Sequence, residues 1–92
     1  MATREVTIKN RIGLHLKPAG ALSNTAMKYR SRIYFRCRGS EIDAKSMLSI
    51  LSACIKCGET IEFVAEGPDA EEALADIADL ADRYFGEKPD AI

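Results

Sequence analysis

The sequence lacks an apolar run that could cross a membrane as a helix, since a crossing takes about 20 residues. It also lacks a signal-peptide pattern, because residues 1–5 lead directly into alternating strand-like residues. The chain has only 92 residues, which suits one domain and leaves no room for a deep enclosed active site. We therefore expect a single domain in the cytoplasm, not inserted into a membrane.

Cysteine is scarce, and its three copies do not suit a disulfide framework. An odd number of cysteines without a secretory signal argues against such a framework. Cys54 and Cys57 have the C-x-x-C spacing that also occurs in redox and zinc sites, but no second pair is present. The other candidate ligands, Cys37 and His15, are distant in sequence. We interpret Cys54 and Cys57 as small apolar residues at the end of a helix, and expect no metal and no cofactor.

Charge is unevenly distributed along the chain, although the net charge is only −1. Residues 1–38 contain nine basic residues and one acidic residue, for a net charge of +8. Residues 39–92 contain four basic and thirteen acidic residues, for a net charge of −9. Such an asymmetry suggests contact with nucleic acid or a membrane, or a charged tail.

Apolar periodicity predicts seven elements in the order β-α-β-β-α-β-α. The expected strands cover residues 5–9, 32–38, 41–44 and 60–66. The expected helices cover about 16–27 or 16–29, 47–53 and 70–86. Pro18 marks the first turn of the first helix, where its missing N–H costs nothing. Asp69 and Glu72 have capping-box spacing at the start of the third helix. Three helices against one antiparallel sheet make a two-layer α+β domain.

His15 is the only histidine, and it lies just before the helix that Pro18 marks. A lone histidine is more often a surface or core residue. Here, however, the free N–H groups of a helix N-terminus attract anions, and Lys17 adds a positive charge. Neutral imidazole is a nucleophile near pH 7. The pattern predicts transient capture of a phosphoryl group on His15, held by the backbone amides of Leu16 and Lys17 without a metal.

Two segments carry a resemblance to a known family. Residues 13–19, GLHLKPA, resemble the phosphorylation motif of HPr, the histidine-containing phosphocarrier of the bacterial sugar phosphotransferase system. Residues 44–48, AKSML, resemble the regulatory serine segment of that family. The resemblance covers residues 1–86, which we expect to form a single HPr-like domain, with residues 87–92 as a frayed tail. It implies an open-faced sandwich whose four-stranded antiparallel sheet, in the order 1-4-2-3, is covered on one face by three helices.

The resemblance also implies a function. His15 would accept phosphate on Nδ1 from enzyme I, whose own donor is phosphoenolpyruvate, and pass it to a IIA domain of a sugar transporter. The protein would then be a phosphorylated intermediate in a relay, not an enzyme, and we expect it to be a monomer. Ser46 would be phosphorylated by HPr kinase/phosphorylase, which would connect the protein to catabolite regulation and to a transcriptional regulator.

The partner-binding surface implied by the resemblance comprises Leu16, Lys17, Gly20, Lys45, Met47, Leu48 and Leu51. Core packing is the alternative interpretation for the last three, and for Leu51 both interpretations remain open. Three positions depart from the family: Lys17 replaces an arginine, Leu16 replaces a small residue or threonine, and Gly20 replaces a common alanine. An ammonium group keeps the charge of a guanidinium but loses its two parallel hydrogen bonds.

Ser46 also fits a purely structural role, because a serine directly before a short helix is a typical N-cap. Both roles are compatible, since phosphate at a helix N-terminus is electrostatically favourable. Phosphorylation would add a charge of about −1.5 to −2 near the partner-binding surface. We therefore expect it to repel an acidic partner.

Two other functions remain as alternatives. The altered residues Leu16 and Lys17 suggest a regulatory HPr-like protein that acts mainly through Ser46 and serves little sugar transport. A nucleic-acid binder is suggested by the strand face that carries Arg32, Arg36 and Arg38, although few aromatic residues accompany them.

The sheet order offers a different explanation for those arginines. In the order 1-4-2-3, Arg32 and Arg36 would lie beside Glu62 and Glu66, so that the opposite charges cancel across the sheet. The cationic remainder around His15 would then consist of Arg11, Lys17 and Lys45.

Overall fold

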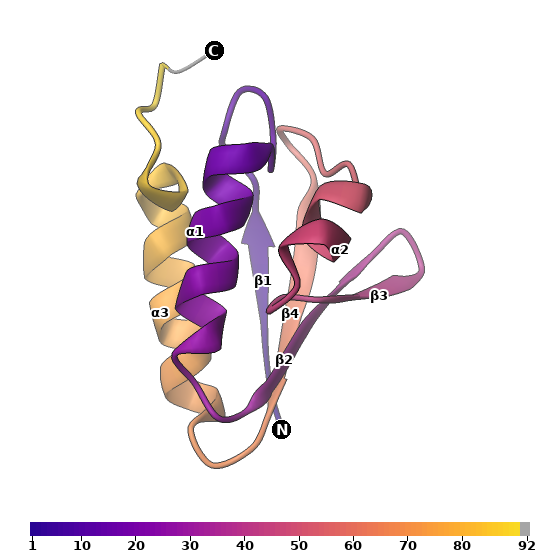
Figure 1. Ribbon diagram of the computed structural model, residues 1–92, viewed down its shortest axis with the longest axis vertical. Helices are drawn as coiled ribbons and strands as arrows, with labels where there is room; N and C mark the ends of the chain where they lie inside the picture. The colour runs from indigo at the N-terminus through magenta and orange to yellow at the C-terminus, as the bar shows by residue number, and fades with distance from the viewer. Residues whose placement is uncertain (91–92) are drawn as a thin grey trace.

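The computed structural model describes residues 1–90 and contains four strands, three α-helices and a final 3-10 turn (Figure 1). The strands are β1 (Ala2–Thr7), β2 (Arg32–Cys37), β3 (Ser40–Asp43) and β4 (Thr60–Glu66). The helices are α1 (Leu16–Met27), α2 (Met47–Ser52) and α3 (Ala70–Asp82), and η1 (Tyr84–Gly86) follows them. The predicted element order is confirmed. Within the described residues, no helix is both long and apolar enough to cross a membrane.

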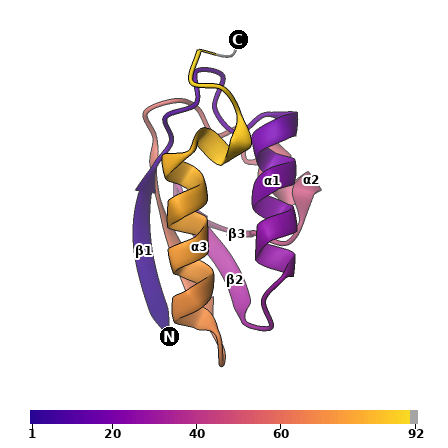
Figure 2. The same cartoon turned by 90° about the vertical axis from the view of Figure 1, so that its left-hand side faces the viewer.

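The four strands form one antiparallel sheet in the order β1-β4-β2-β3. In its register, Val6 lies opposite Ile61 and Phe35 lies opposite Phe63. Figures 1 and 2 show α1 and α3 side by side over one face of this sheet, with α2 beside α1 on the same side. The fold is therefore the two-layer, open-faced α+β sandwich expected from the sequence.

Alternation along the strands builds the core between the sheet and the helices. Phe35 of β2 and Phe63 of β4 are fully buried, with ring centroids 5.2 Å apart in a tilted arrangement. Leu22 of α1, Ile50 of α2 and Ile77 of α3 belong to the same buried cluster as these rings. Each such side chain contributes about 1.5–3 kcal/mol on leaving water. Hydrophobic burial thus fixes all three helices to one face.

The open face of the sheet is less exposed than simple alternation predicts. Tyr34 points to that face, yet it is only 5% exposed because it lies between two guanidinium groups. The guanidinium carbons of Arg32 and Arg36 lie 4.2 and 5.7 Å from its ring centroid. Val64, directly opposite Tyr34 in β4, is fully buried. Cation–π contacts therefore let a small apolar cluster persist outside the main core.

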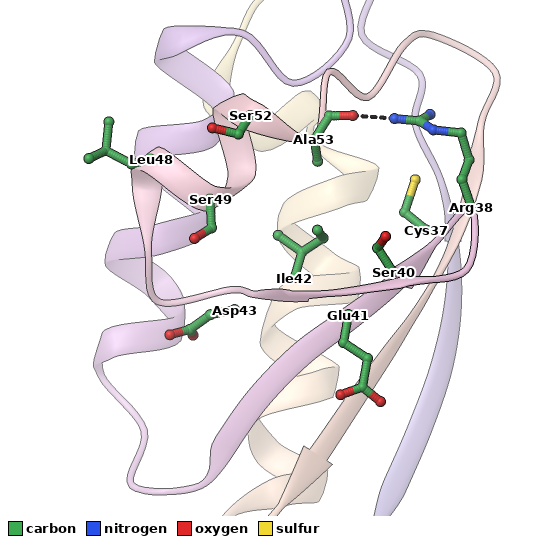
Figure 3. A pocket seen from close by; sticks show the side chains of 10 residues that line it. All are labelled: Cys37, Arg38, Ser40, Glu41, Ile42, Asp43, Leu48, Ser49, Ser52 and Ala53. Carbon is green, nitrogen blue, oxygen red and sulfur yellow. Dashed lines mark hydrogen bonds between the residues drawn. The ribbon is translucent and has the colours of Figure 1, made fainter.

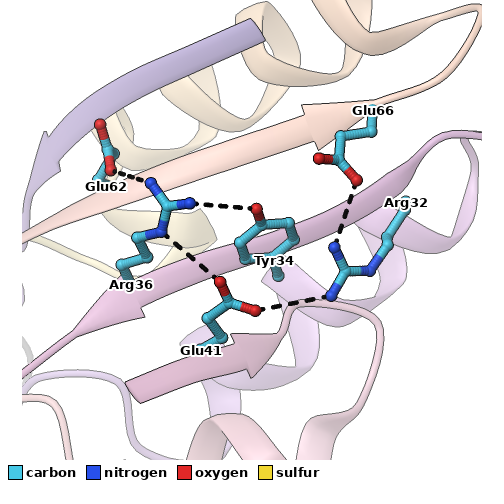
Figure 4. A network of polar contacts seen from close by, with 6 residues as sticks. All are labelled: Arg32, Tyr34, Arg36, Glu41, Glu62 and Glu66. Carbon is cyan, nitrogen blue, oxygen red and sulfur yellow. Dashed lines mark hydrogen bonds and ion pairs between the residues drawn. The ribbon is translucent and has the colours of Figure 1, made fainter. Parts of the chain in front are cut away.

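Ion pairs cross the same face, as Figure 4 shows. Arg32 lies 3.3 Å from Glu66, and Arg36 lies 3.1 Å from Glu62. The carboxylate of Glu41 on β3 lies 3.7 Å from each of the two arginines. The predicted pairing of strand arginines with strand glutamates is confirmed, so much of the charge asymmetry cancels within the sheet.

The predicted capping box at α3 is wrong. Asp69 occupies the N-cap position, but its side chain makes no capping bond. Its carboxylate instead accepts hydrogen bonds from the amides of Arg30 and Ser31, both at 2.9 Å, and from the Ser31 hydroxyl at 2.5 Å. These bonds, the Ser31 hydroxyl foremost, lower the pKa of Asp69 to about 2. Asp69 thus ties the beginning of α3 to the beginning of β2 rather than closing its own helix.

We expect Asp69→Asn to lower the free energy of unfolding near pH 6, because an amide cannot accept all three bonds. The lowered pKa means that the carboxylate stabilises the fold above about pH 4 and loses this effect as the pH falls toward 2. Urea unfolding should therefore show a difference between wild type and variant that shrinks over that range. Asp82→Asn, at an exposed position, is the control and should behave like wild type. A difference that is constant between pH 6 and pH 2 would contradict this role.

Gly20 lies inside α1, where glycine weakens a helix relative to alanine. A Cβ atom at this position would lie 3.7 Å from Cε of Met47, which is an ordinary van der Waals contact. We expect Gly20→Ala to raise the free energy of unfolding by roughly 0.5–1 kcal/mol. Ala75→Gly on the exposed face of α3 is the matched opposite change and should lower it by a similar amount. Destabilisation by Gly20→Ala in urea would show that the α1–α2 contact is tighter than described.

Candidate functional site

The loop between β1 and α1 is held in place by main-chain hydrogen bonds to the loop before β4. Gly58 N–H donates to Ile8 O at 2.7 Å, and Leu14 N–H donates to Ile55 O at 3.0 Å. Gly13 has a φ of +78°, and a Cβ atom there would lie only 2.1 Å from Ile55 O. Only glycine fits this close approach of two backbones. The loop is therefore a rigid support for the next residues, His15 and the first turn of α1.

His15 is the N-cap residue of α1, as Pro18 predicted. Its backbone is extended, with φ −81° and ψ −164°, and its carbonyl accepts the Ala19 N–H at 2.9 Å. The side chain makes no capping bond and is 33% exposed. The imidazole thus lies at the positive end of the helix, where another protein can reach it.

The first turn of α1 has two amides to offer an anion. Pro18 has no N–H, and Ala19 N–H is bonded to His15, so the amides of Leu16 and Lys17 lack an acceptor within the helix. No acidic residue is present in this turn, and the Lys17 side chain is exposed. Helix dipole, free amides and ammonium therefore all favour a negative group beside His15.

Sequence reasoning missed two residues of the site, Asn10 and Glu87. His15 Nε2 lies 2.5 Å from Oε2 of Glu87. Oε1 of the same carboxylate accepts a hydrogen bond of 2.8 Å from Asn10 Nδ2. Asn10 and Glu87 are 1% and 9% exposed. No local signal could have found this contact, because Glu87 lies 77 residues after Asn10 and 72 after His15.

The position of Glu87 differs from the frayed tail expected from residue 87 onward. Its amide donates to Tyr84 O at 2.9 Å, and the buried Phe85 anchors the preceding turn. The Asn10 hydrogen bond, then that of His15 and the charge of Lys17, lower the pKa of the Glu87 carboxyl. Figure 2 shows how η1, after α3, brings the chain across to the first turn of α1. The rest of the expected tail includes residues 91–92, which lie outside the described residues.

The expected partner-binding residues lie mainly on neighbouring faces of α1 and α2. Leu16 and Leu48 are 65% and 77% exposed, which leaves their side chains accessible to another protein. Met47 is partly buried and packs near Gly20. Leu51 is also partly buried against the core, so it serves packing while keeping part of its surface accessible. We call Leu16, Gly20, Met47, Leu48 and Leu51 the apolar patch.

Lys45 does not belong to the cationic rim around His15, which corrects the sequence-based expectation. Its Nζ donates to Tyr29 O at 2.8 Å, just beyond the C-terminal end of α1. His15 is at the other end of this 12-residue helix, which is about 18 Å long. The ammonium of Lys45 lies near the C-terminal end of α1 because the carbonyl groups at a helix C-terminus attract cations.

Ser46 is the N-cap residue of α2, as the sequence predicted. Its hydroxyl oxygen accepts the Ser49 N–H at 3.2 Å, and its side chain is partly exposed. It directly precedes Met47 and Leu48 of the apolar patch. A modification of Ser46 would therefore lie beside this patch and not beside His15.

A cavity of about 650 Å³ lies between the β2–β3 hairpin and α2, and Figure 3 shows the residues around it. Leu48 is part of its lining, whereas His15 and Ser46 are not. The phosphoacceptor candidate thus occupies an open surface rather than this cavity. That arrangement suits exchange with a protein more than enclosure of a small substrate.

The cysteines differ from their sequence-based interpretation. Cys37 is buried, but Cys54 and Cys57 are exposed and do not serve as apolar packing residues. Both cysteines follow the end of α2. The residue of this segment that packs in the core is Ile55, which lies between them and is 2% exposed. Residues 1–90 contain no group of three His, Cys, Asp or Glu side chains that could hold a metal ion.

Comparison with known proteins identifies the family. Residues 2–83 match the family model described as PTS HPr component phosphorylation site. Phosphocarrier protein HPr of Cupriavidus necator is 31% identical over 87 residues, covering 95% of this chain and 98% of that protein. The HPr-like protein Crh of Halalkalibacterium halodurans is 32% identical, covering 80% of this chain and 88% of that protein.

A solved structure agrees with these matches. HPr-C-His from Thermoanaerobacter tengcongensis has a TM-score of 0.91 and 36% identity, covering 96% of this chain and 99% of that chain. The family-model match, over residues 2–83, includes the four strands, the three α-helices and the segment that contains His15. The chain belongs to the HPr family, the phosphocarrier proteins of the phosphotransferase system.

Proposed function

We propose that this protein accepts a phosphoryl group on His15 from enzyme I and passes it to a IIA domain of a sugar transporter. The observation that carries the proposal is the position of the single histidine, partly exposed at the N-terminus of α1. Membership of a phosphocarrier family supports the same role. The protein is then a substrate of its partners, and its own contribution is to present and stabilise the phosphoryl group.

The stabilisation comes from groups on the first turn of α1. The amides of Leu16 and Lys17 are available to donate to phosphoryl oxygens, and the Lys17 ammonium supplies a full positive charge. Lys17 lacks the bidentate geometry of arginine, so the charge is retained while the hold on the oxygens is looser. The apolar patch lies on the adjoining faces of α1 and α2, where it is suited to contact enzyme I and the IIA domain.

The second candidate function is a regulatory one, carried by Ser46. The similarity to an HPr-like protein Crh favours it, as does the position of Ser46 beside the apolar patch. In this function, a kinase such as HPr kinase/phosphorylase modifies Ser46, and the modified protein acts on a transcriptional regulator. A phosphate would keep its place at the N-terminus of α2, where the helix dipole favours negative charge.

Nucleic-acid binding finds no support in the arrangement of the strand arginines. Arg32 and Arg36 are paired with glutamates, and Arg38 donates both to Glu59 and to the carbonyl of Ala53. Binding a phosphate backbone would require breaking these pairs before any new one forms. We therefore set this alternative aside.

The phosphoacceptor is tested with phosphoenolpyruvate and enzyme I. Wild-type protein should form a phosphoprotein that is labile in acid and stable in alkali, as expected for phosphohistidine. His15→Ala should form none, while its circular dichroism shows that the protein is still folded. Phosphorylation of His15→Ala at the wild-type level, or failure of wild type to react at all, would refute the proposal.

Ser46 is tested by a pair of substitutions. We expect Ser46→Asp to slow phosphorylation of His15 by enzyme I, because it places negative charge beside the apolar patch, while aspartate preserves the cap. Ser46→Ala should lower the free energy of unfolding by about 0.5–2 kcal/mol through loss of the cap, without slowing the reaction. Ser40→Asp on β3 controls for net charge. Equal rates for Ser46→Asp and Ser40→Asp would remove the regulatory role of this position.

A further inference from the structure

The carboxylate of Glu87 is nearly buried and has a partner for each of its two oxygens. Its side chain is 7% exposed, and both oxygens are occupied, Oε1 by Asn10 at 2.8 Å and Oε2 by His15 at 2.5 Å. Phe85 is buried and packs in the core beside α1, so the turn that carries Glu87 is anchored. The contact is therefore part of the fold and not a casual surface pair.

Asn10 fixes the orientation of this carboxylate. Its Nδ2 donates both to Oε1 of Glu87 and to the carbonyl of Tyr84 at 2.9 Å, and the residue is 1% exposed. Rotating the amide would place its oxygen against two acceptors and break both bonds. The side chain of Asn10 thus has one orientation, with its donors toward Glu87.

An ionised carboxylate can only accept hydrogen bonds, so the ring nitrogen facing it must be a donor. At neutral pH the Glu87 carboxyl is ionised, because its hydrogen bonds and Lys17 hold its pKa below the ordinary value. Nε2 of His15 therefore carries the proton. The lone pair of the neutral ring is then on Nδ1, which has no hydrogen-bond partner within residues 1–90.

We propose that Glu87 is a positioning residue for phosphoryl transfer: it holds the His15 proton on Nε2, so that Nδ1 is the nucleophile and Nε2 is shielded from phosphorylation. This inference rests on the proposed function of His15 as phosphoacceptor. Asn10 acts through Glu87 by holding the carboxylate in place. The arrangement resembles the carboxylate–histidine pair of hydrolases, in which an aspartate selects the imidazole tautomer.

The transfer step balances without any further reactant. The Nδ1 lone pair forms the new N–P bond as the N–P bond of the donor phosphohistidine breaks. The electron pair of the broken bond returns to the donor imidazole. The Nε2 proton stays on His15, whose ring becomes positively charged, and the adjacent Glu87 carboxylate stabilises that charge. The reverse arrangement serves transfer to the acceptor.

The decisive variant is Glu87→Gln, which keeps size and shape. Because Asn10 presents donors, it selects the carbonyl oxygen of the new amide, and the NH₂ group must then face Nε2. Nε2 would become an acceptor and the proton would move to Nδ1. Glu5→Gln on β1, an exposed position without a described hydrogen bond, is the matched control for the loss of one charge.

The tautomer of His15 is determined from the ¹⁵N chemical shifts of its imidazole ring at pH 8. This measurement needs no phosphoryl donor. Wild type and Glu5→Gln should show a protonated Nε2, and Glu87→Gln should show a protonated Nδ1. A wild-type ring protonated on Nδ1, or an unchanged tautomer in a folded Glu87→Gln, would overturn the proposal. Should that variant fail to fold, the wild-type measurement alone still decides.

The reacting atom is read with phosphoramidate, a small donor that requires no partner protein. Wild type should give the Nδ1 phosphohistidine by ³¹P spectroscopy, whereas Glu87→Gln should react at Nδ1 about tenfold or more slowly and gain the Nε2 product. A merely structural role would change the rate without changing the product. The same Nδ1 product and rate in both proteins would refute the positioning role. Failure of wild type with enzyme I would refute only the proposed carrier function.

Discussion

The site around His15 depends on a main-chain contact between the loop before α1 and the loop before β4. The loop of residues 8–14 is bonded to residues 55–59, and Gly13 approaches Ile55 so closely that no side chain fits between them. Burial of Ile55 fixes the second loop to the core, and that loop fixes the first. His15 follows directly and takes its position at the start of α1. Hydrophobic packing in the centre thus determines where α1 begins, and with it the backbone position of His15, through these main-chain hydrogen bonds.

Local patterns predicted most of the fold, and long-range contacts account for what they missed. The alternation of apolar and polar residues predicts β2 and β4, because it depends only on residues close in sequence. Pro18 likewise predicts the start of α1, and therefore the location of His15 directly before that helix. The carboxylates of Asp69 and Glu87 instead find their partners 38 or more residues away. Such side-chain contacts leave no periodic signal. From their neighbours in sequence, Asp69 is therefore predicted to cap a helix and Glu87 to belong to a tail.

Many of the opposite charges of the two halves of the chain are paired with each other on the open face of the sheet. Arg32 and Arg36 face glutamates across the sheet, and the ammonium of Lys45 binds the carbonyl of Tyr29. Exposed pairs of this kind contribute little to stability individually, but they occupy cations that would otherwise attract a polyanion. Lys17 remains exposed beside His15. A single exposed ammonium group is better suited to one phosphoryl group than a broad basic surface would be.

In the proposed function, the protein must keep its phosphoryl group from water until the next protein arrives, and the contacts of Glu87 are compatible with this. Hydrolysis needs a base to activate water, and Glu87 is the carboxylate next to the ring. Both of its oxygens are engaged, by Asn10 and by His15, and its side chain is nearly buried, so it is poorly placed to accept a proton from water. Leu16 and the rest of the apolar patch would exclude water only when a partner covers them, which would strengthen the electrostatic contacts at that moment. The same residues can therefore protect the phosphoryl group from hydrolysis in the free protein and support its transfer once a partner has docked.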